Sequence, residues 1–277
     1  MSVELGGASA TDVSSNVILS NSIFSNGGIG INLIDPGALV PVGESEGPTA
    51  NDPGDTDSGP NQLQNKPVLT SARAVGDKTI VEGTLNSHPD ETYTVQFFSN
   101  PSGNEGKKFL GQKTVTTDGS GNASFTFSAA AVKVGHNITA TDTREFSLDT
   151  SEFSAPKTVK DATAPTVKSV APAENATGVA PSANVSAIFS EAMKVSTVNA
   201  TTVTLKKAGA TKNVAATVTF DVTRKKTVLN PSANLTSGAT YVATITTGAQ
   251  DLAGNALDQN ASKAGNQPKV WKFTVKK

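Results

Sequence analysis

Residues 79–100 read TIVEGTLNSHPDETYTVQFFSN, and this stretch decides the fold class of the region around it. Apolar side chains recur at every second position around Val81 and again around Val95, which is the period of a β-strand and not of a helix. The polar run 86–89 (Asn-Ser-His-Pro) between the two sets is a turn signal. The stretch therefore predicts two short strands joined by a turn.

Segments with the same alternation continue on both sides. About seven short strands separated by Gly, Asp, Asn and Pro turns are typical of an antiparallel β-sandwich. The predicted strands are 68–74, 79–85, 93–99, 109–117, 123–127, 137–141 and 152–159. The side chains predicted to point inward are Val81, Leu85, Tyr93, Val95, Phe97, Leu110, Val115, Phe125, Phe127, Ile138 and Phe153.

The C-terminal region repeats this pattern and predicts a second sandwich. Its predicted strands are 166–171, 184–190, 202–207, 214–221, 226–230, 240–246 and 270–275. Alternation predicts that Val185, Ala187 and Phe189 point inward from one strand, and that Trp271, Phe273 and Val275 do so from the last. Residues 196–199 are expected to form one helical turn between the sheets.

The N-terminal region has a different texture. In residues 16–35, NVILSNSIFSNGGIGINLID, short apolar bursts are separated by Asn, Ser and Gly, which is typical of a parallel β-solenoid coil. One or two coils cannot bury a core, so we interpret residues 1–34 as the remnant rung of a longer solenoid. Residues 35–66 are rich in Pro, Gly and Asp without periodicity, and predict an acidic, irregular linker.

Composition narrows the range of functions. The 277 residues include no Cys and only two His, which excludes thiol chemistry and leaves little for acid–base catalysis near neutral pH. No apolar run approaches the roughly 18 residues of a membrane span. Residues 1–160 contain 10 Lys or Arg and 18 Asp or Glu, whereas residues 161–277 contain 13 and 6. Neither part has the dense Lys and Arg with aromatics of a nucleic-acid surface, and we expect no enzyme in this chain, although a solenoid upstream of residue 1 could be catalytic.

One candidate metal site stands out in the linker. Residues 51–61, NDPGDTDSGPN, bring Asp52, Asp55, Asp57 and Asn61 together, and hard oxygen ligands of this kind from a flexible loop are typical of Ca²⁺ sites. The alternative is a solvated acidic loop whose Asp and Asn side chains cap their own turns. Elsewhere, Asp118–Asn122 and Asp251–Asn255 share the pattern D-x-x-G-N, which predicts turns closed by the Asp side chain.

Three stretches resemble known families. The run NVILSNSIFSNGGIGINL resembles right-handed parallel β-helix repeats of bacterial surface proteins and polysaccharide lyases. The series GPNQLQNKPVLTSA, FLGQKTVTTDGSGNASFTF and TSEFS is similar to the Ig-like module that follows such helices in secreted bacterial proteins, although residues 142–149, DTREFSLD, depart from its usual D-x-x-G-N turn. Residues 161–277, with APTVKSVAPAENATGVAPSANVSAIFSEAM and a closing WKFTV, resemble the bacterial Ig-like domain of S-layer proteins and adhesins.

These resemblances imply a C-terminal fragment of a secreted bacterial surface protein. The fold expected is all-β, with two tandem Ig-like antiparallel β-sandwiches at 67–160 and 161–277 preceded by the remnant parallel β-solenoid coil. The function implied is a non-catalytic structural or adhesive spacer at the cell surface or in an S-layer. Two alternatives stay open: a subunit that assembles into a filament or lattice through head-to-tail or donated-strand contacts, and a carbohydrate-binding module. The partners implied are copies or adjacent modules of the parent, the cell envelope and surface glycans, with calcium as the candidate cofactor.

Overall fold

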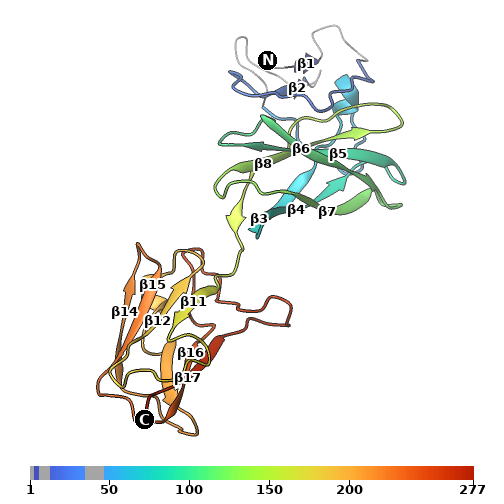
Figure 1. The fold of residues 1–277 in the computed structure, drawn as a ribbon. Helices are drawn as coiled ribbons and strands as arrows, with labels where there is room; N and C mark the ends of the chain where they lie inside the picture. Colours follow the sequence, from blue (N-terminus) through green and yellow to red (C-terminus); the bar gives the residue numbers. More distant parts are fainter. Residues whose placement is uncertain (1–2, 6–12, 35–46) are drawn as a thin grey trace. The chain divides into compact units, whose positions relative to one another are not determined.

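The computed structural model describes residues 3–5, 13–34 and 47–277, and those residues form an all-β protein (Figure 1). The chain divides into two compact units, Met1–Asp161 and Ala162–Lys277. Each unit contains two stacked sheets, and the predicted all-β class with Ig-like sandwiches is confirmed.

Unit 1 is a sandwich of two four-stranded sheets. One sheet has the order β10-β3-β4-β7, with β3 (Val68–Val75), β4 (Lys78–Asn86), β7 (Asn122–Ala130) and β10 (Lys160–Asp161). The other has the order β6-β5-β8-β9, with β5 (Thr92–Asn100), β6 (Lys108–Thr116), β8 (Asn137–Arg144) and β9 (Lys157–Thr158). The parallel pairing of β10 with β3 is an exception to the otherwise antiparallel ladders within this sandwich.

The inner faces of the two sheets form the core that alternation predicted, with one error. Eight of the predicted side chains are buried in one cluster: Val81, Leu85, Tyr93, Val95, Phe97, Val115, Phe125 and Ile138. Leu110 and Phe127 are partly buried against it. Phe153 is the exception, because it belongs to a second apolar cluster with Ile23, Ile31, Leu33, Leu63 and Phe98.

The predicted strand 152–159 is wrong over its first half. Residues 151–154 run beside β8, and Ser151 N and Ser154 N donate to the carbonyls of Asp142 and Ala140 at 2.9 and 2.7 Å. In return, Asp142 N and Ala140 N donate to the hydroxyls of Ser151 and Ser154, both at 3.0 Å. Because these side chains take the place of backbone acceptors, the segment pairs with β8 without forming a regular ladder.

The second apolar cluster lies on the outer face of the β5–β8 sheet. Alternate residues of β5 that should face solvent, Gln96 and Phe98, are 0% and 2% exposed. The N-terminal segment, residues 13–34, covers them: Ser20 N donates to Gln96 Oε1, and Ile23, which forms a two-way bridge with Gly106, belongs to the same apolar cluster as Phe98. Phe153, from the loop after β8, meets Phe98 edge-on at 5.4 Å. A Cβ on Gly106 would lie 2.6 Å from the Phe153 ring, so this approach requires glycine.

Side chains of the sandwich satisfy the backbone of the N-terminal segment. Several of its N–H groups donate to side-chain oxygens of the sandwich, which take the place of the backbone acceptors of a neighbouring strand. The pairs are Ser15 N to Asp149 Oδ1 (2.6 Å), Ile18 N to Thr150 Oγ1 (3.0 Å), Ser20 N to Gln96 Oε1 (2.7 Å) and Leu33 N to Glu152 Oε1 (3.0 Å). The segment is therefore part of unit 1.

Two short strands, β1 (Val3–Leu5) and β2 (Ile31–Leu33), pair in parallel, as neighbouring coils of a solenoid would. One pair of three-residue strands does not make a coil, and the predicted solenoid rung at 1–34 stays a prediction.

Residues 35–46 of the predicted linker lie outside the described residues. Residues 47–66 are irregular, as expected, but they are packed on unit 1, where Asp55, Asn61 and Asn65 are each at most 1% exposed. This stretch includes one short turn, η1 (Pro60–Leu63).

Unit 2 is the second sandwich. Its sheets have the orders β11-β12-β15-β14 and β13-β16-β17. The strands are β11 (Val167–Ala171), β12 (Val185–Phe189), β13 (Val203–Lys207), β14 (Ala216–Asp221), β15 (Lys226–Pro231), β16 (Thr240–Ile245) and β17 (Lys269–Thr274). The helical turn expected at 196–199 is present as the short 3-10 helix η2 (Val195–Thr197). The six side chains predicted to point inward are all buried in one core.

The outer cluster of unit 1 yields a stability prediction. We expect Phe98→Ala to lower the free energy of unfolding of unit 1 by about 3–5 kcal/mol, because it removes a buried ring and leaves a cavity under the N-terminal segment. Phe146→Ala is the matched control, since the Phe146 ring is 83% exposed and should change stability by at most about 0.5 kcal/mol. Differential scanning calorimetry would measure both. Equal effects of the two variants would contradict the packing described above.

Candidate functional site

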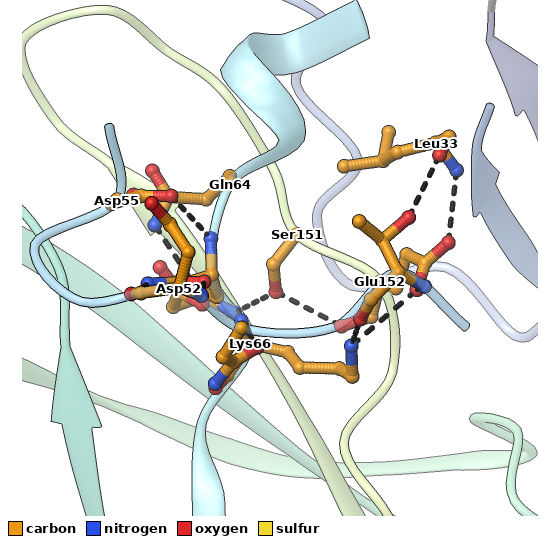
Figure 2. Close-up of polar contacts among 11 residues, drawn as sticks. Leu33, Asp52, Asp55, Gln64, Lys66, Ser151 and Glu152 are labelled. Carbon is orange, nitrogen blue, oxygen red and sulfur yellow. Dashed lines mark hydrogen bonds and ion pairs between the residues drawn. The ribbon is translucent and has the colours of Figure 1, made fainter. Parts of the chain in front are cut away.

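The most unusual chemistry of the described residues is a group of buried ionisable side chains in unit 1. Residues 49–66 meet the loop that follows β8 there, and Figure 2 shows Asp52, Asp55, Lys66 and Glu152 in this contact. Asp142, on β8, adds a further buried carboxyl nearby. We call the carboxyl groups of Asp55, Asp142 and Glu152, together with the Lys66 ammonium beside Glu152, the buried carboxyl cluster.

Glu152 ties three segments together (Figure 2). Its Oε1 accepts from Leu33 N at 3.0 Å, and its Oε2 accepts from Thr49 N at 2.8 Å. The Lys66 ammonium lies 3.6 Å from Oε2 and donates to the Thr49 carbonyl. Burial raises the pKa of Glu152, and the hydrogen bonds and Lys66 oppose that rise. The Glu152 carboxylate therefore joins the N-terminal segment to the loop before β3, because it accepts a backbone hydrogen bond from each of them.

Asp55 is held by a chain of hydroxyl groups. Its Oδ1 accepts from Asn65 N at 2.9 Å, and its Oδ2 accepts from the Ser87 hydroxyl. Because that hydroxyl has one proton, the Tyr93 hydroxyl, 2.8 Å away, must donate to Ser87. Burial is the main cause that raises the pKa of Asp55 to about 6, and the Asp52 carboxylate adds to it.

Asp142 is the least compensated group. It lies opposite Val95 in the β5–β8 ladder, so its side chain shares the inner face of the sheet with the apolar core. It is 0% exposed, and neither carboxyl oxygen has a hydrogen-bond partner among the described residues. Burial raises the pKa of Asp142 well above its usual range. The protonated form of this side chain is therefore the one that the core favours.

The structure brings three of the four predicted calcium ligands together. Oxygens of Asp52, Asp55 and Asp57 lie within 4.8 Å of one another. Asp52 Oδ2 accepts from the amide and hydroxyl of Thr56, and its Oδ1 is buried without a hydrogen-bond partner. Three carboxylates suit a hard cation, although Ca²⁺ takes six to eight oxygens and the rest would be carbonyls or water. Calcium stays a prediction.

Asn61 does not belong with these carboxylates. Its Oδ1 accepts from the backbone and side-chain nitrogens of Asn16, both at 3.0 Å. Its Nδ2 donates to the carbonyls of Asn16 and Thr150, at 2.9 and 3.0 Å. These bonds join the N-terminal segment to the loop after β8, and the role of Asn61 as a metal ligand stays a prediction.

Sequence reasoning missed Lys66, Asp142 and Glu152. One signal was present: Asp142 occupies an inward position of an alternating strand, where a charged residue is unusual.

The two D-x-x-G-N segments form the turns that the sequence predicts, each closed by its Asp side chain. Asp118 Oδ1 accepts from Ser120 N and Asn122 N, and Asp251 Oδ1 accepts from Asn255 N. In both turns the glycine, Gly121 or Gly254, has a positive φ.

Comparison with known families finds a match in the second unit. Residues 161–275 match the model of the bacterial Ig-like domain. No curated protein matches the chain in sequence.

Solved structures give weaker likenesses. They include the N-terminal part of the bacterial S-layer protein SbsC (17% identity, 41% of this chain and 24% of that one, TM-score 0.31). They also include the BSP domain of a biofilm associated protein (18% identity, 78% and 30%, TM-score 0.26) and a marsupial T cell receptor (11% identity, 74% and 71%, TM-score 0.41). The chain spans 14–24% of the three S-layer structures that it matches. Likenesses at these values assign no activity.

A search of the described residues for membrane-spanning helices found none of sufficient length and apolarity.

The buried carboxyl cluster predicts an unusual pH dependence of unit 1. A carboxyl whose pKa is raised on folding stabilises the fold below its ordinary pKa, and that contribution is lost as the pH rises through the raised value. For Asp55, with a rise from 3.8 to about 6, the loss between pH 4 and pH 7 is about 2 kcal/mol. His88 acts in the opposite direction, because burial lowers its pKa.

Comparing wild type with Asp55→Asn isolates the carboxyl from His88. We expect the variant to be at least as stable as wild type at pH 7.5, and to lose less stability between pH 4 and pH 7. Urea unfolding followed at several pH values would measure this. Parallel pH profiles for the two proteins would refute a raised pKa of Asp55.

Calcium binding predicts a second stability effect. If the three carboxylates bind Ca²⁺, millimolar Ca²⁺ at pH 7.5 should raise the melting temperature of unit 1 and leave that of unit 2 unchanged. Asp57→Asn should abolish the rise, whereas Asp77→Asn, an exposed acid of the β3–β4 turn, should retain it. No rise in wild type would exclude a calcium site at this position.

Proposed function

We propose that the chain is a non-catalytic structural or adhesive spacer module of an extracellular bacterial cell-surface or S-layer-associated protein. The observation that carries the proposal is the match of residues 161–275 to the bacterial Ig-like domain. Unit 1 adds a second sandwich, built by the same alternation of inward and outward side chains. The connection between β10 and β11, residues 162–166, contains no Gly and includes Pro165, which favours a stiffer link than a Gly/Ser tether.

The roles of the ionisable residues support a structural function. Glu152 and Asp149 accept hydrogen bonds from backbone N–H groups of the N-terminal segment, and Lys66 compensates the charge of Glu152. Groups committed in this way hold a loop in place and have little freedom to move a proton to or from a substrate. On this proposal, perturbed pKa values in unit 1 are a consequence of burial and not a sign of catalysis.

Assembly by strand donation is less well supported. A donated segment needs backbone groups that a neighbour's sheet edge can bind. In residues 13–34, Ser15, Ile18, Ser20 and Leu33 already donate to side chains of their own unit, and Ile23 is bridged to Gly106. Donation would first have to break these contacts and uncover Phe98.

A carbohydrate-binding module of the usual aromatic type is also less well supported. Such modules stack exposed aromatic rings on sugars. Tyr93, Tyr241 and Trp271 are 0%, 4% and 2% exposed, so their rings are committed to the two cores.

Surface labelling would test the proposal. Antibodies raised against residues 162–277 should label intact cells that make the protein, and protease treatment of intact cells should remove the label. A cytoplasmic protein of the same cells is the control, and it should react only after permeabilisation. Labelling of the chain that also requires permeabilisation would overturn an extracellular location, and with it the proposed function.

A further inference from the structure

Unit 1 has a basic groove near the end of β5, where Ser99 contributes to its lining. The groove has a volume of about 250 Å³ and contains Lys107, Lys108, Lys133 and His136 in its lining. These four residues come from the start of β6 and from the connection between β7 and β8.

The positive charge here contrasts with the rest of the unit. Residues 1–160 contain 18 acidic and 10 basic residues, and three of those ten line this one groove. None of the three lysines takes part in an ion pair with any residue that the structure describes. Glu105, the acid closest to them in sequence, has its carboxylate bonded to the Asn26 side chain at 2.5 Å. The groove therefore gathers cations that form no ion pair with a carboxylate of the described residues.

The groove also has an apolar component. Pro101, Ala131 and Val132 contribute to its lining, and Val132 is buried at 9% exposure. Beside it, the Lys107 ammonium lies 4.8 Å from the centre of the Phe24 ring, which is 40% exposed. A ligand with an apolar face and a negatively charged substituent would match both features.

We propose that this groove binds an anionic sugar, through ion pairs from Lys108 and Lys133 to its carboxylate or phosphate group and apolar contact from Pro101 and Val132 to its ring. The inference deepens the proposed function, because it names a ligand class for a surface module. Its recognition differs from aromatic stacking, for which the Tyr and Trp rings are unavailable. The net negative charge of the unit disfavours an extended polyanion such as nucleic acid, whereas a single charged ring meets mainly the local field of the lysines.

Isothermal titration calorimetry on the full chain would test this at low ionic strength. The ligands are trigalacturonate for the carboxylate source, glucose 1-phosphate for the phosphate source, and maltotriose as the neutral comparison. The groove variant is Lys108→Glu with Lys133→Glu, both exposed positions. The control with the same charge change is Lys78→Glu with Lys113→Glu, which are exposed in unit 1 and outside the groove.

We expect at least one of the two acidic sugars to bind, and the one that binds tells which anionic group is recognised. The groove variant should bind it about tenfold more weakly or worse, the control should bind like wild type within about twofold, and added salt should weaken binding. Three results would overturn the site: no binding of either acidic sugar, equal binding of maltotriose, or equal loss in both variants. A chain absent from the cell surface would overturn the proposed function without changing these titrations.

Discussion

Residues 13–34 lie on the outer face of the β5–β8 sheet, and the organisation of unit 1 depends on this contact. A sandwich normally leaves the outer faces of its sheets to water, but here Gln96, Phe98 and the threonines of β8 are covered. The apolar part of the contact is the cluster around Phe98 and Phe153. Its polar part is the row of side-chain acceptors that replace a neighbouring strand. Burial of that backbone is favourable only because each of the N–H groups described above has an acceptor.

The buried carboxyl cluster follows from the same arrangement. Once residues 47–66 and the N-terminal segment close over the loop after β8, Glu152 is removed from water, and Lys66 becomes its counter-charge. Burial of Asp55 and Asp142 places further carboxyls in a medium that disfavours their ionised forms. The contact that completes the fold therefore also perturbs Glu152, whereas Asp142 is buried on the inner face of its own sheet. Unit 2, with its core built around Trp271, Phe273 and Phe189, has no such covering segment in its described fold.

A module of this kind has its chemistry at its surface. Glu152, Asn61 and Gln96 are used in holding segments of unit 1 together, whereas Lys108 and Lys133 line a groove and form no ion pair with any described residue. The enclosed carboxyls and the exposed lysines thus lie in different parts of unit 1. The N-terminal segment covers the outer face of the sheet, and the lysines that line the proposed groove remain exposed.

Alternation along the strands was sufficient to predict the sandwiches, because the inner face of a strand is defined by every second residue. Val81, Val95 and Trp271 were placed correctly for that reason, and the D-x-x-G-N turns are local motifs whose bonds span at most four residues. The outer cluster and the carboxyl cluster could not be predicted in this way. Phe153 meets Phe98, Asn61 meets Asn16 and Glu152 meets Leu33 across 55, 45 and 119 positions. Only the tertiary structure decides which distant side chain supplies the partner of a given backbone group.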